Sequence, residues 1–490
     1  MPTMERTLHP DALDDRQDAA AGASPARSAS PLSAMQQMEA ALVQIGVTKA
    51  HKQVIALILS GCLFDSLEQN TVGIVGPLLR RQWGLTMADI GFLNTLTFAS
   101  AAAGRLLSGL IGDRHGRRVM LGTNLLLFTA GSLGCALAPD FTALCVFRVI
   151  VGFGIGGEVS TAVTMLSEFC SPAFRGTAAG LVNVGAGGIG NFLAPMFGLL
   201  VFTLFPGPNG WRFLFASLAI PCLLVVFYRR FMPETPRFLV SAGRIAEANT
   251  VLSQFASGSL RTLRGASTPY VTAEPPGHGA GRPAAWHSIF APPYLSRTLF
   301  VSCAILMCYG AQLSVLTLLP TIFMSLGHSY TNSLVDTSIT QAGSVVGTLL
   351  ASFLARSVPR RKVLTAGALC AVLSVAGILS AAHNADAVMT CAVIFQVFAL
   401  LLNTSIWVYV PELYPTRSRA FGVAVVLAAG SAAGAIMPTV TGSLFDHHGL
   451  GAVLTLVAIM YGACLVCIQF SPETFDRSME YASLPAQDRP

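Results

Sequence analysis

The chain has 490 residues, of which only 11% are charged and 53% are hydrophobic. Soluble domains contain about 25% charged residues, so this composition excludes a water-soluble globular protein of this size as well as a wholly disordered chain. The net charge of +6 would suggest nucleic-acid binding in a soluble protein, but here the charges lie between long apolar runs. A protein of the lipid bilayer remains, with no nucleic-acid partner expected.

The N-terminal part of the chain is polar. Residues 1–30 are rich in Ala, Ser, Asp, Pro and Arg without an apolar period, which predicts a disordered tail. They lack the apolar core of a cleaved signal peptide. From Pro31 to Lys52, apolar residues recur at helical spacing before a basic cluster, which predicts an amphipathic helix at the membrane surface.

Twelve apolar segments follow, each with the ~20 residues that a membrane-spanning helix needs. They are residues 53–75, 89–111, 119–138, 143–165, 176–203, 212–230, 297–322, 334–356, 363–382, 387–410, 419–444 and 451–470. We therefore predict an all-α membrane protein. Its predicted parts are a cytoplasmic tail (1–52), a six-helix bundle (53–230), a polar central loop (231–296), a second six-helix bundle (297–470) and a C-terminal tail (471–490).

The distribution of Lys and Arg predicts the orientation of these spans. The connections on one side carry eighteen of these residues and those on the other side carry three. Since cytoplasmic loops carry the excess, both termini and the central loop are predicted to be cytoplasmic, in a multi-pass protein of the plasma (inner) membrane. The end of the helices that is predicted to be cytoplasmic is called the inner end below, and the opposite end the outer end.

Three short motifs occur once in each half, at offsets of 239 to 244 residues. Each lies at the predicted cytoplasmic end of corresponding spans. They are Glu168 to Arg175 with Glu412 to Arg419, Arg114–Arg118 with Arg356–Arg361, and Pro-Glu-Thr at 233–235 and 472–474. Three matches at nearly one offset indicate a doubled six-helix unit. This plan is common in secondary transporters, whose substrate site lies near the midplane between the halves.

The strongest local motif is Gly109-Leu-Ile-Gly-Asp113-Arg114-His-Gly116-Arg117-Arg118, between the second and third spans. Gly109 and Gly116 permit close helix approach and a tight turn, and Asp113 can face the positive end of a neighbouring helix. The arginines can reach Glu168 at the end of the fourth span. Such a cluster can act as an inner gate that holds one conformation. If the arginines served only to fix topology, the glycines and Asp113 would not be needed.

This segment resembles the signature loop of the major facilitator superfamily, and the resemblance covers about residues 50–475. Further matches are the runs Arg148 to Glu158, Pro233 to Leu239 and Pro411 to Arg419. The resemblance implies two pseudo-symmetric bundles of six helices. Within the superfamily the chain is similar to the branch of sugar porters, organic-ion carriers and aromatic-acid or nicotinate proton symporters.

The second copy of the loop departs from the pattern, because no acid stands at the place of Asp113. The gate in the second half is therefore expected to rest on Glu412. The complete predicted inner gate consists of Gly109, Asp113, Arg114, Gly116, Arg117, Arg118, Glu168, Arg175, Glu412 and Arg419.

Five ionisable residues lie well inside the predicted spans, all of them in the first half: Asp65, Glu68, Arg105, Arg148 and Glu158. A charge inside the bilayer is costly and is a functional hypothesis by default. Asp65 and Glu68, three residues apart on one helix, can bind a proton between them. The pair resembles the Asp-x-x-Asp of aromatic-acid symporters, with Glu at the second place.

We therefore predict proton coupling at Asp65, Glu68 and Glu158. The alternative is that these acids form salt bridges with Arg105 or Arg148 and serve only to assemble the bundle.

The second half has polar amides and aromatic rings near its midplane in place of charges. The predicted substrate-binding residues are Arg105, Arg148, Tyr309, Gln312, Gln341, Gln396, Asn403 and Trp407. Amides and aromatic faces suit a flat polar organic substrate, and an arginine can bind its anionic group. Each amide alone could instead make an interhelical hydrogen bond. Glycines four apart, such as Gly343 and Gly347, suit helix surfaces that slide between the halves.

These features together predict a secondary active transporter that moves a small aromatic or heteroaromatic carboxylate with protons by alternating access. A sugar or polyol symporter, an organic-cation or drug antiporter and, more remotely, a transporter-like sensor are the alternatives. The sequence has no evident catalytic constellation or metal-ligand cluster, so no enzyme activity, cofactor or metal is expected. The expected partners are the substrate, protons and the lipid bilayer, and the protein is expected to be a monomer.

Overall fold

The computed structural model describes residues 33–220, 222–260, 267–272, 289–290, 292, 294–355, 357–381, 384–414 and 419–474. The predicted disordered tail, residues 1–30, lies outside the described residues. Within the described ranges the regular secondary structure consists of helices, without a strand.

The first half contains four continuous spans and two broken ones. The continuous spans are α2 (Lys49–Trp83), α3 (Met87–His115), α4 (Arg117–Leu137) and α5 (Phe141–Phe169). The fifth span changes from α6 (Pro172–Asn183) to a glycine-rich π-helical stretch, η3 (Val184–Gly190), and then to α7 (Asn191–Leu204). The sixth is formed by two short helices, α8 (Gly210–Ser217) and α9 (Cys222–Phe231).

The second half contains α12 (Tyr294–Ser325), α13 (Tyr330–Leu354), α14 (Arg360–Ser380), α15 (Ala385–Tyr409), the short 3-10 helix η5 (Val410–Leu413) and α16 (Arg419–Gln469). The last two predicted spans are both in α16, where no loop separates them. The bend between them is at Gly449, whose φ of 73° lies in a region that glycine adopts without strain.

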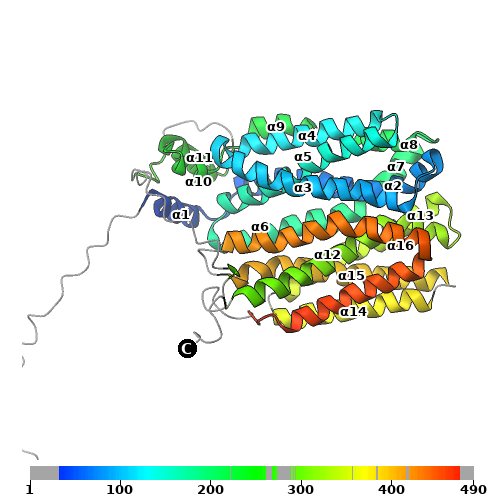
Figure 1. The fold of residues 1–490 in the computed structure, drawn as a ribbon. Coiled ribbons are helices and arrows are strands. Elements are labelled where there is room, and N and C mark those ends of the chain that lie inside the picture. Colours follow the sequence, from blue (N-terminus) through cyan, green and yellow to red (C-terminus); the bar gives the residue numbers. More distant parts are fainter. Residues whose placement is uncertain are drawn as a thin grey trace, which may run out of the picture.

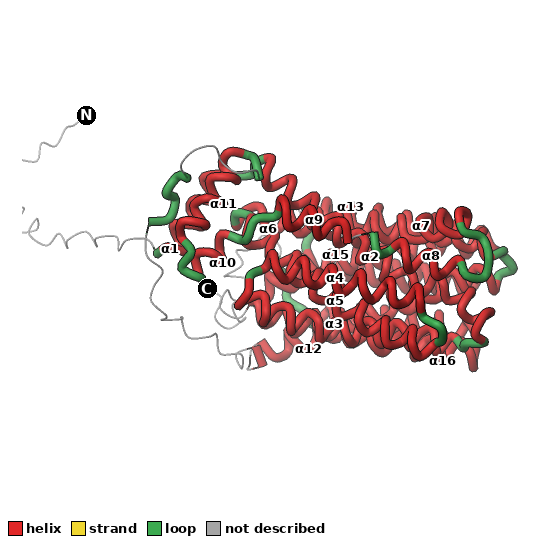
Figure 2. Tube along the Cα trace, turned by 90° about the horizontal axis from the view of Figure 1, so that it is seen from above, coloured by secondary structure: helices red, strands yellow, loops and turns green. Residues whose placement is uncertain are grey.

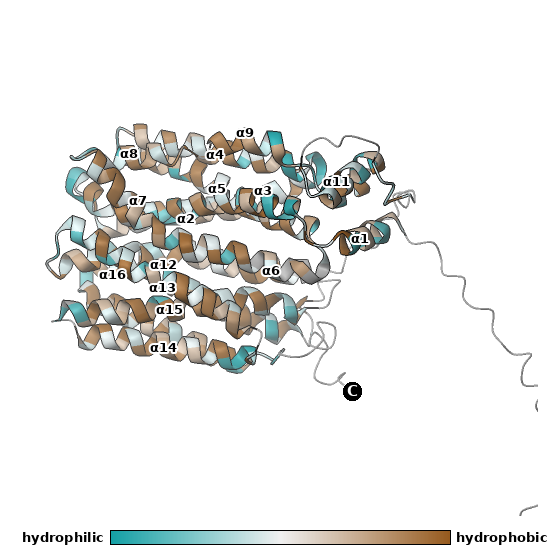
Figure 3. Cartoon of the chain, turned by 180° about the vertical axis from the view of Figure 1, so that it is seen from behind, coloured by the Kyte–Doolittle hydropathy of each residue, from teal (hydrophilic) through white to brown (hydrophobic). Residues whose placement is uncertain are grey.

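The helices run side by side along one direction, with the blue and cyan helices of the first half above the yellow to red helices of the second in Figure 1. By length and composition, eight helical segments can cross a membrane: α4, α5, the α6–α7 segment and α12 to α16. The remaining spans are the more polar α2 and α3 and the short α8 and α9. Hydrophobic residues extend along the bundle, whereas hydrophilic ones gather toward its ends (Figure 3). The prediction of an all-α membrane protein is confirmed.

Three further helices, α1 (Ala34–Ile45), α10 (Pro236–Ser241) and α11 (Ile245–Ser257), form a helical cap beyond the inner end of the bundle (Figures 1 and 2). Met38 and Leu42 of α1 are buried, and α1 packs on α10 and α11. Protein therefore covers apolar side chains of α1 that were predicted to lie on a membrane surface. The helix also ends before Gly46, and the basic cluster predicted to follow it belongs to α2.

Aromatic contacts attach the cap to the first half. The His51 ring of α2 packs edge-on against Phe255 of α11, with ring centroids 4.5 Å apart, and Phe255 stacks on Phe169 of α5 at 5.1 Å. The guanidinium group of Arg117 lies 5.3 Å from the centroid of Phe238 in α10. Part of the predicted central loop is thus helical and packed against the bundle.

Glycines allow the closest helix crossings within each half. A Cβ on Gly156 of α5 would lie 2.0 Å from the carbonyl oxygen of Ala101 in α3. In the second half, a Cβ on Gly347 of α13 would lie 2.2 Å from the carbonyl oxygen of Val397 in α15, and Gly343 makes a similar contact one turn earlier. The prediction that Gly343 and Gly347 form a surface between the halves is therefore wrong, because both face a helix of their own half.

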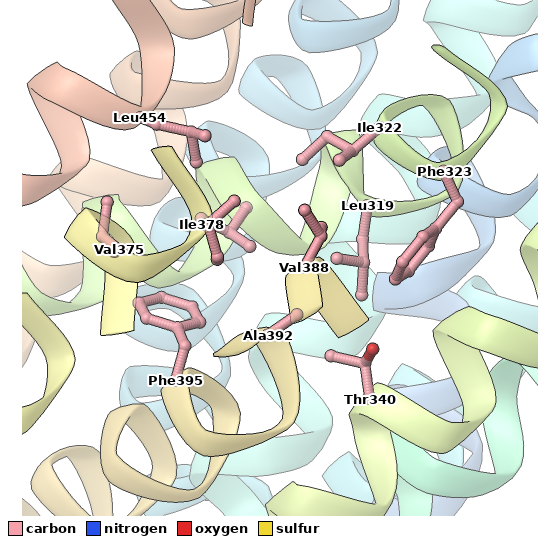
Figure 4. A pocket seen from close by; sticks show the side chains of 11 residues that line it. Leu319, Ile322, Phe323, Thr340, Val375, Ile378, Val388, Ala392, Phe395 and Leu454 are labelled. Carbon is pink, nitrogen blue, oxygen red and sulfur yellow. The ribbon is translucent and has the colours of Figure 1, made fainter. Parts of the chain in front are cut away.

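A small apolar void lies among α12, α13, α14, α15 and α16 of the second half (Figure 4). Its volume of 10 Å³ is close to the space of one water molecule, but a buried water needs two to four polar partners. The hydroxyl of Thr340 is the polar side-chain group at this void, and its oxygen has no hydrogen-bond partner.

Replacing Thr340 with valine is expected to stabilise the protein by about 1 kcal/mol, because it removes a buried unpaired hydroxyl and keeps the side-chain shape. Thermal unfolding of the purified protein in detergent measures the change. The matched control is Thr337→Val on the same helix, which removes a hydroxyl that donates to the Ser333 carbonyl at 2.6 Å and should not stabilise. A Thr340→Val protein that melts at or below the parent temperature would contradict the prediction.

Candidate functional site

An ion pair between Glu68 and Arg148 is completely buried in the first half. Glu68 projects from α2 and Arg148 from α5, and both side chains are 0% exposed. Arg148 Nη1 donates to Glu68 Oε1, and Arg148 Nε donates to the hydroxyl of Thr97 in α3 at 3.0 Å. Arg148 therefore neutralises the charge of Glu68. This agrees with the alternative that Glu68 forms a salt bridge that assembles the bundle.

Asp65 has a different environment, although it is close to Glu68 in sequence. It is 2% exposed, and neither of its carboxyl oxygens has a hydrogen-bond partner. Glu68 of the same helix and Glu158 of α5 are the acids near it. Side chains three residues apart on a helix point about 60° apart, so one acid can face Arg148 while the other faces Glu158.

Glu158 completes this group of acids from α5. It is 1% exposed, and its Oε2 atom has no hydrogen-bond partner. Its carboxyl group lies over Gly61, one turn before Asp65: a Cβ at Gly61 would be 2.2 Å from Glu158 Oε1 and 2.6 Å from the Tyr228 hydroxyl. The structure therefore places Glu158 of α5 over the turn of α2 that precedes Asp65, whereas the sequence predicted Glu68 as the acid beside Asp65.

Arg105 of α3 lies at the boundary between the two halves. Its Nη1 atom donates to the hydroxyl of Ser431 in α16, and its Nε atom is buried without a partner. Tyr309 of α12 packs near Gly430, the residue before Ser431, where a Cβ would lie 3.9 Å from the Tyr309 Cβ. A guanidinium group with an unused donor beside an aromatic ring can bind a flat anion.

Gln341 and Gln396 belong to a chain of amides that joins the halves. Gln396 Nε2 donates to Gln341 Oε1 at 2.6 Å, and Gln341 Nε2 donates to Asn70 Oδ1 of α2 at 3.3 Å. Asn70 Nδ2 in turn donates to Asn191 Oδ1 of α7 at 2.9 Å. Sequence reasoning missed Asn70 and Asn191. Their position inside apolar spans was the available signal, since polar side chains there are rare and have a specific partner.

The remaining predicted substrate residues form a second group. Asn403 Nδ2 of α15 donates to Gln312 Oε1 of α12 at 2.6 Å. Trp407 is half-buried one turn after Asn403. These amides are therefore paired with each other, as the alternative of interhelical hydrogen bonds anticipates.

Charged groups at the inner end of the first half meet at Arg117. Its Nη2 atom is 2.6 Å from Asp113 Oδ1, and its Nε atom is 3.3 Å from Glu168 Oε2. The hydroxyl of Thr235 donates to Glu168 Oε2 at 2.6 Å. The second half repeats this arrangement at its own inner end, where Arg360 Nη2 is 3.1 Å from Glu412 Oε1.

The two Pro-Glu-Thr motifs cap helices at these positions. Glu234 accepts hydrogen bonds from the backbone N–H groups of Arg117 at 3.0 Å and Arg118 at 3.2 Å, at the start of α4. Glu473 does the same for Arg360 at 2.9 Å and Arg361 at 3.0 Å, at the start of α14. The sequence repeat identified these motifs but not their role as partners of the inner gate.

The predicted gate is only partly assembled. The Asp113 side chain is 69% exposed and forms an ion pair with Arg117, the first residue of α4. Gly109 is exposed with open space around it, and Arg114 is also exposed. Gly116 does make the expected tight turn, with a φ of 97° beside the Glu234 carboxylate. The side chains of Arg175 and Arg419 lie outside the described part of the structure.

Replacing Glu234 with alanine is expected to destabilise the protein by about 1–3 kcal/mol, because two N–H groups at the start of α4 lose a charged acceptor. Burial raises the pKa of Glu234, while the backbone N–H groups and Arg117 oppose this effect. Thermal unfolding measures the loss. The exposed Glu247 is the control, since Glu247→Ala should leave the melting temperature unchanged. Equal effects of the two substitutions would refute the capping role.

These features define the class of protein: a membrane carrier with two similar halves around a polar midplane. Residues 31–483 match the family model described as Sugar (and other) transporter. The chain therefore belongs to this transporter family of the major facilitator superfamily.

Several curated relatives are similar over nearly the whole chain. The niacin transporter NiaP of Acinetobacter baylyi is 27% identical over 446 residues, which cover 89% of this chain and 98% of that protein. The inner membrane metabolite transport protein YdjE of Escherichia coli is 26% identical, with coverage of 91% and 98%. A probable 4-methylmuconolactone transporter of Cupriavidus pinatubonensis is 25% identical, with coverage of 85% and 89%.

Solved structures of the xylose transporter XylE from E. coli have the same fold. A partially occluded inward open conformation matches with a TM-score of 0.71 at 19% identity, covering 87% of this chain and 99% of that one. An inward open conformation matches with a TM-score of 0.69 at 17% identity, covering 88% and 99%. The prediction of a twelve-helix major facilitator fold is confirmed by this likeness.

Proposed function

We propose that the protein is a proton-coupled symporter of a small aromatic or heteroaromatic carboxylate, located in the plasma (inner) membrane with both termini in the cytoplasm. The observation that carries the proton coupling is Asp65, whose two carboxyl oxygens are buried without a hydrogen-bond partner in the middle of α2. A charged carboxylate in such a position is costly, so its protonation is the change that transport can use. Glu158 is the second proton-binding group in this proposal.

Arg105 supports a carboxylate as the substrate. Its buried Nε atom has no partner, and the half-buried Tyr309 lies nearby. A carboxylate can accept a charge-assisted hydrogen bond from this guanidinium group, while an aromatic ring packs on Tyr309. The relatives named for niacin and for 4-methylmuconolactone point in the same direction.

Uptake into proteoliposomes that contain the purified protein tests this proposal. Labelled nicotinate and benzoate are supplied outside, with an inward proton gradient and an inside-negative potential, and protein-free liposomes serve as the control. Accumulation that a protonophore collapses is expected for at least one acid, and Arg105→Gln should raise the concentration for half-maximal uptake about tenfold or more. Uptake of a cationic dye without uptake of either acid would refute the carboxylate proposal.

A sugar or polyol is the second candidate substrate. The amide pairs Gln312 with Asn403 and Gln341 with Gln396 favour it, because amides donate to and accept from hydroxyl groups. Labelled D-xylose in the same assay separates the two proposals. Xylose uptake that Gln312→Ala abolishes, without uptake of either acid, would favour the sugar.

A further inference from the structure

The outer ends of the two halves are joined at Asp446 of α16. Its Oδ2 atom accepts a hydrogen bond from the backbone N–H of Ala88, in the first turn of α3, at 2.9 Å. Its Oδ1 atom is 3.9 Å from Arg80 Nη2, near the end of α2. The carboxylate belongs to the second half and both partners belong to the first. A negative charge at the start of a helix is stabilised by the helix dipole and by the unsatisfied N–H groups there.

Directly below this contact, α3 and α16 touch backbone to backbone. A Cβ on Gly91 of α3 would lie 2.2 Å from the carbonyl oxygen of Pro438, and a Cβ on Gly442 of α16 would lie 2.3 Å from that of Met87. The hydroxyl groups of Thr95 and Thr439 are 2.6 Å apart across the same crossing. The outer part of this interface is therefore closed.

A second contact closes the outer end beside α2. The hydroxyl of Tyr330 in α13 donates to the carbonyl oxygen of Ile74 in α2 at 2.7 Å. At the inner end, by contrast, the ion pairs of Arg117 and Arg360 each join groups of one half. In a carrier that exposes its site alternately to the two sides, the outer contacts must break once in every cycle.

We propose that Asp446 is an outer latch, the charged group that holds the second half to α3 and Arg80 while the outer side is closed. The sequence predicted that Asp113 could face the positive end of a helix at the inner gate. At the outer end, Asp446 has this arrangement with the start of α3. The inference rests on the transporter class alone and needs neither the proposed substrate nor proton coupling. Removing the charge shifts the population toward the outward-open state.

Cysteine accessibility in the full-length protein measures this shift without any substrate. Thr321 is a suitable reporter position, because it is buried on α12 and its hydroxyl contacts Met87 Sδ of the first half at 4.0 Å. In a Thr321→Cys background, the labelling by a membrane-impermeant maleimide from the outer side is read as the excess over the same protein with Thr321, because the chain has 11 native cysteines. This labelling should become about tenfold faster with Asp446→Asn, the effect of one charge-assisted hydrogen bond. Arg80→Gln should act in the same direction but more weakly, because the Arg80 contact is longer.

Asp140→Asn is the matched control at the same end. Asp140 also accepts a backbone hydrogen bond at a helix start, from Ala143 at 2.8 Å, but both residues belong to the first half. The control should leave the labelling rate unchanged. Asp446→Glu keeps the charge and should be labelled nearly as slowly as the parent protein. Equal melting temperatures show that the variants are folded. An unchanged rate in a folded Asp446→Asn protein, or the same increase in Asp140→Asn, would overturn the proposal.

Discussion

Replacing Asp65 with asparagine is expected to abolish proton-driven accumulation of the substrate. The amide has nearly the same shape but cannot bind and release a proton, so the carrier loses its coupling and only exchange of substrate remains. A proton that enters with a monovalent carboxylate moves no net charge, so the pH gradient alone drives accumulation. An inward gradient of one pH unit supplies about 1.4 kcal/mol, which corresponds to an accumulation of about tenfold. In proteoliposomes with an imposed gradient, the ratio of internal to external substrate should fall to unity for Asp65→Asn.

Substrate exchange separates lost coupling from lost folding. Asp65→Asn should exchange labelled for unlabelled substrate, with no proton gradient, at a rate near that of the parent protein. Glu158→Gln should keep some accumulation but change its pH dependence, because Asp65 remains as the coupling group while the acid near it is lost. If Asp65→Asn still accumulated substrate in a protonophore-sensitive way, Asp65 would not be the coupling site.

Replacing Arg148 with glutamine is expected to destabilise the protein by about 3–5 kcal/mol, because it leaves a completely buried carboxylate without its partner. The substitution also removes the hydrogen bond from Arg148 Nε to Thr97. Glu68→Gln should have a comparable cost, since it leaves the Arg148 cation uncompensated. Thermal or denaturant unfolding of the purified protein measures both.

The double variant Glu68→Gln with Arg148→Gln is the informative comparison. It contains no unpaired buried charge, so its loss of stability should be clearly smaller than the sum of the two single losses. The exposed pair Arg244 and Glu247 serves as the control, because its removal should not change the unfolding transition measurably. Strictly additive single and double effects would show that the buried pair is not coupled.

Most of the spans could be located from sequence because a long apolar run has few alternatives to a membrane helix. Predicted spans 119–138 and 363–382 correspond to α4 (Arg117–Leu137) and α14 (Arg360–Ser380) within three residues at each end. The broken fifth span was not predicted, since a glycine-rich run has the same hydropathy in an α-helix and a π-helix. In the cap, α1 lies within the predicted amphipathic helix, whereas α10 and α11 were missed because short polar helices depend on tertiary packing. Thr235 before Pro236 was a usable start signal for α10.

The candidate site was only partly predictable. Motifs and hydropathy identified Asp65, Glu68, Arg148 and Glu158 as unusual, because each is an ionisable residue in an apolar run. Their pairing depends on how α2 and α5 are rotated about their axes, which the sequence does not specify. For the same reason the partners of Gln341 could not be named, although Asn70 was visible as a polar residue in the first span.

The attachment of the cap to the first half makes it a reference point for optical measurements of transport. In the described part of the chain, α11 packs on α2 and the neighbouring α10 packs on α5, so a fluorophore on α11 should move with the first half as a rigid body. A second fluorophore at the inner end of α14 would then report the rotation of one half against the other in single molecules. A pair on α11 and α4 would stay at a constant separation and provide the internal standard.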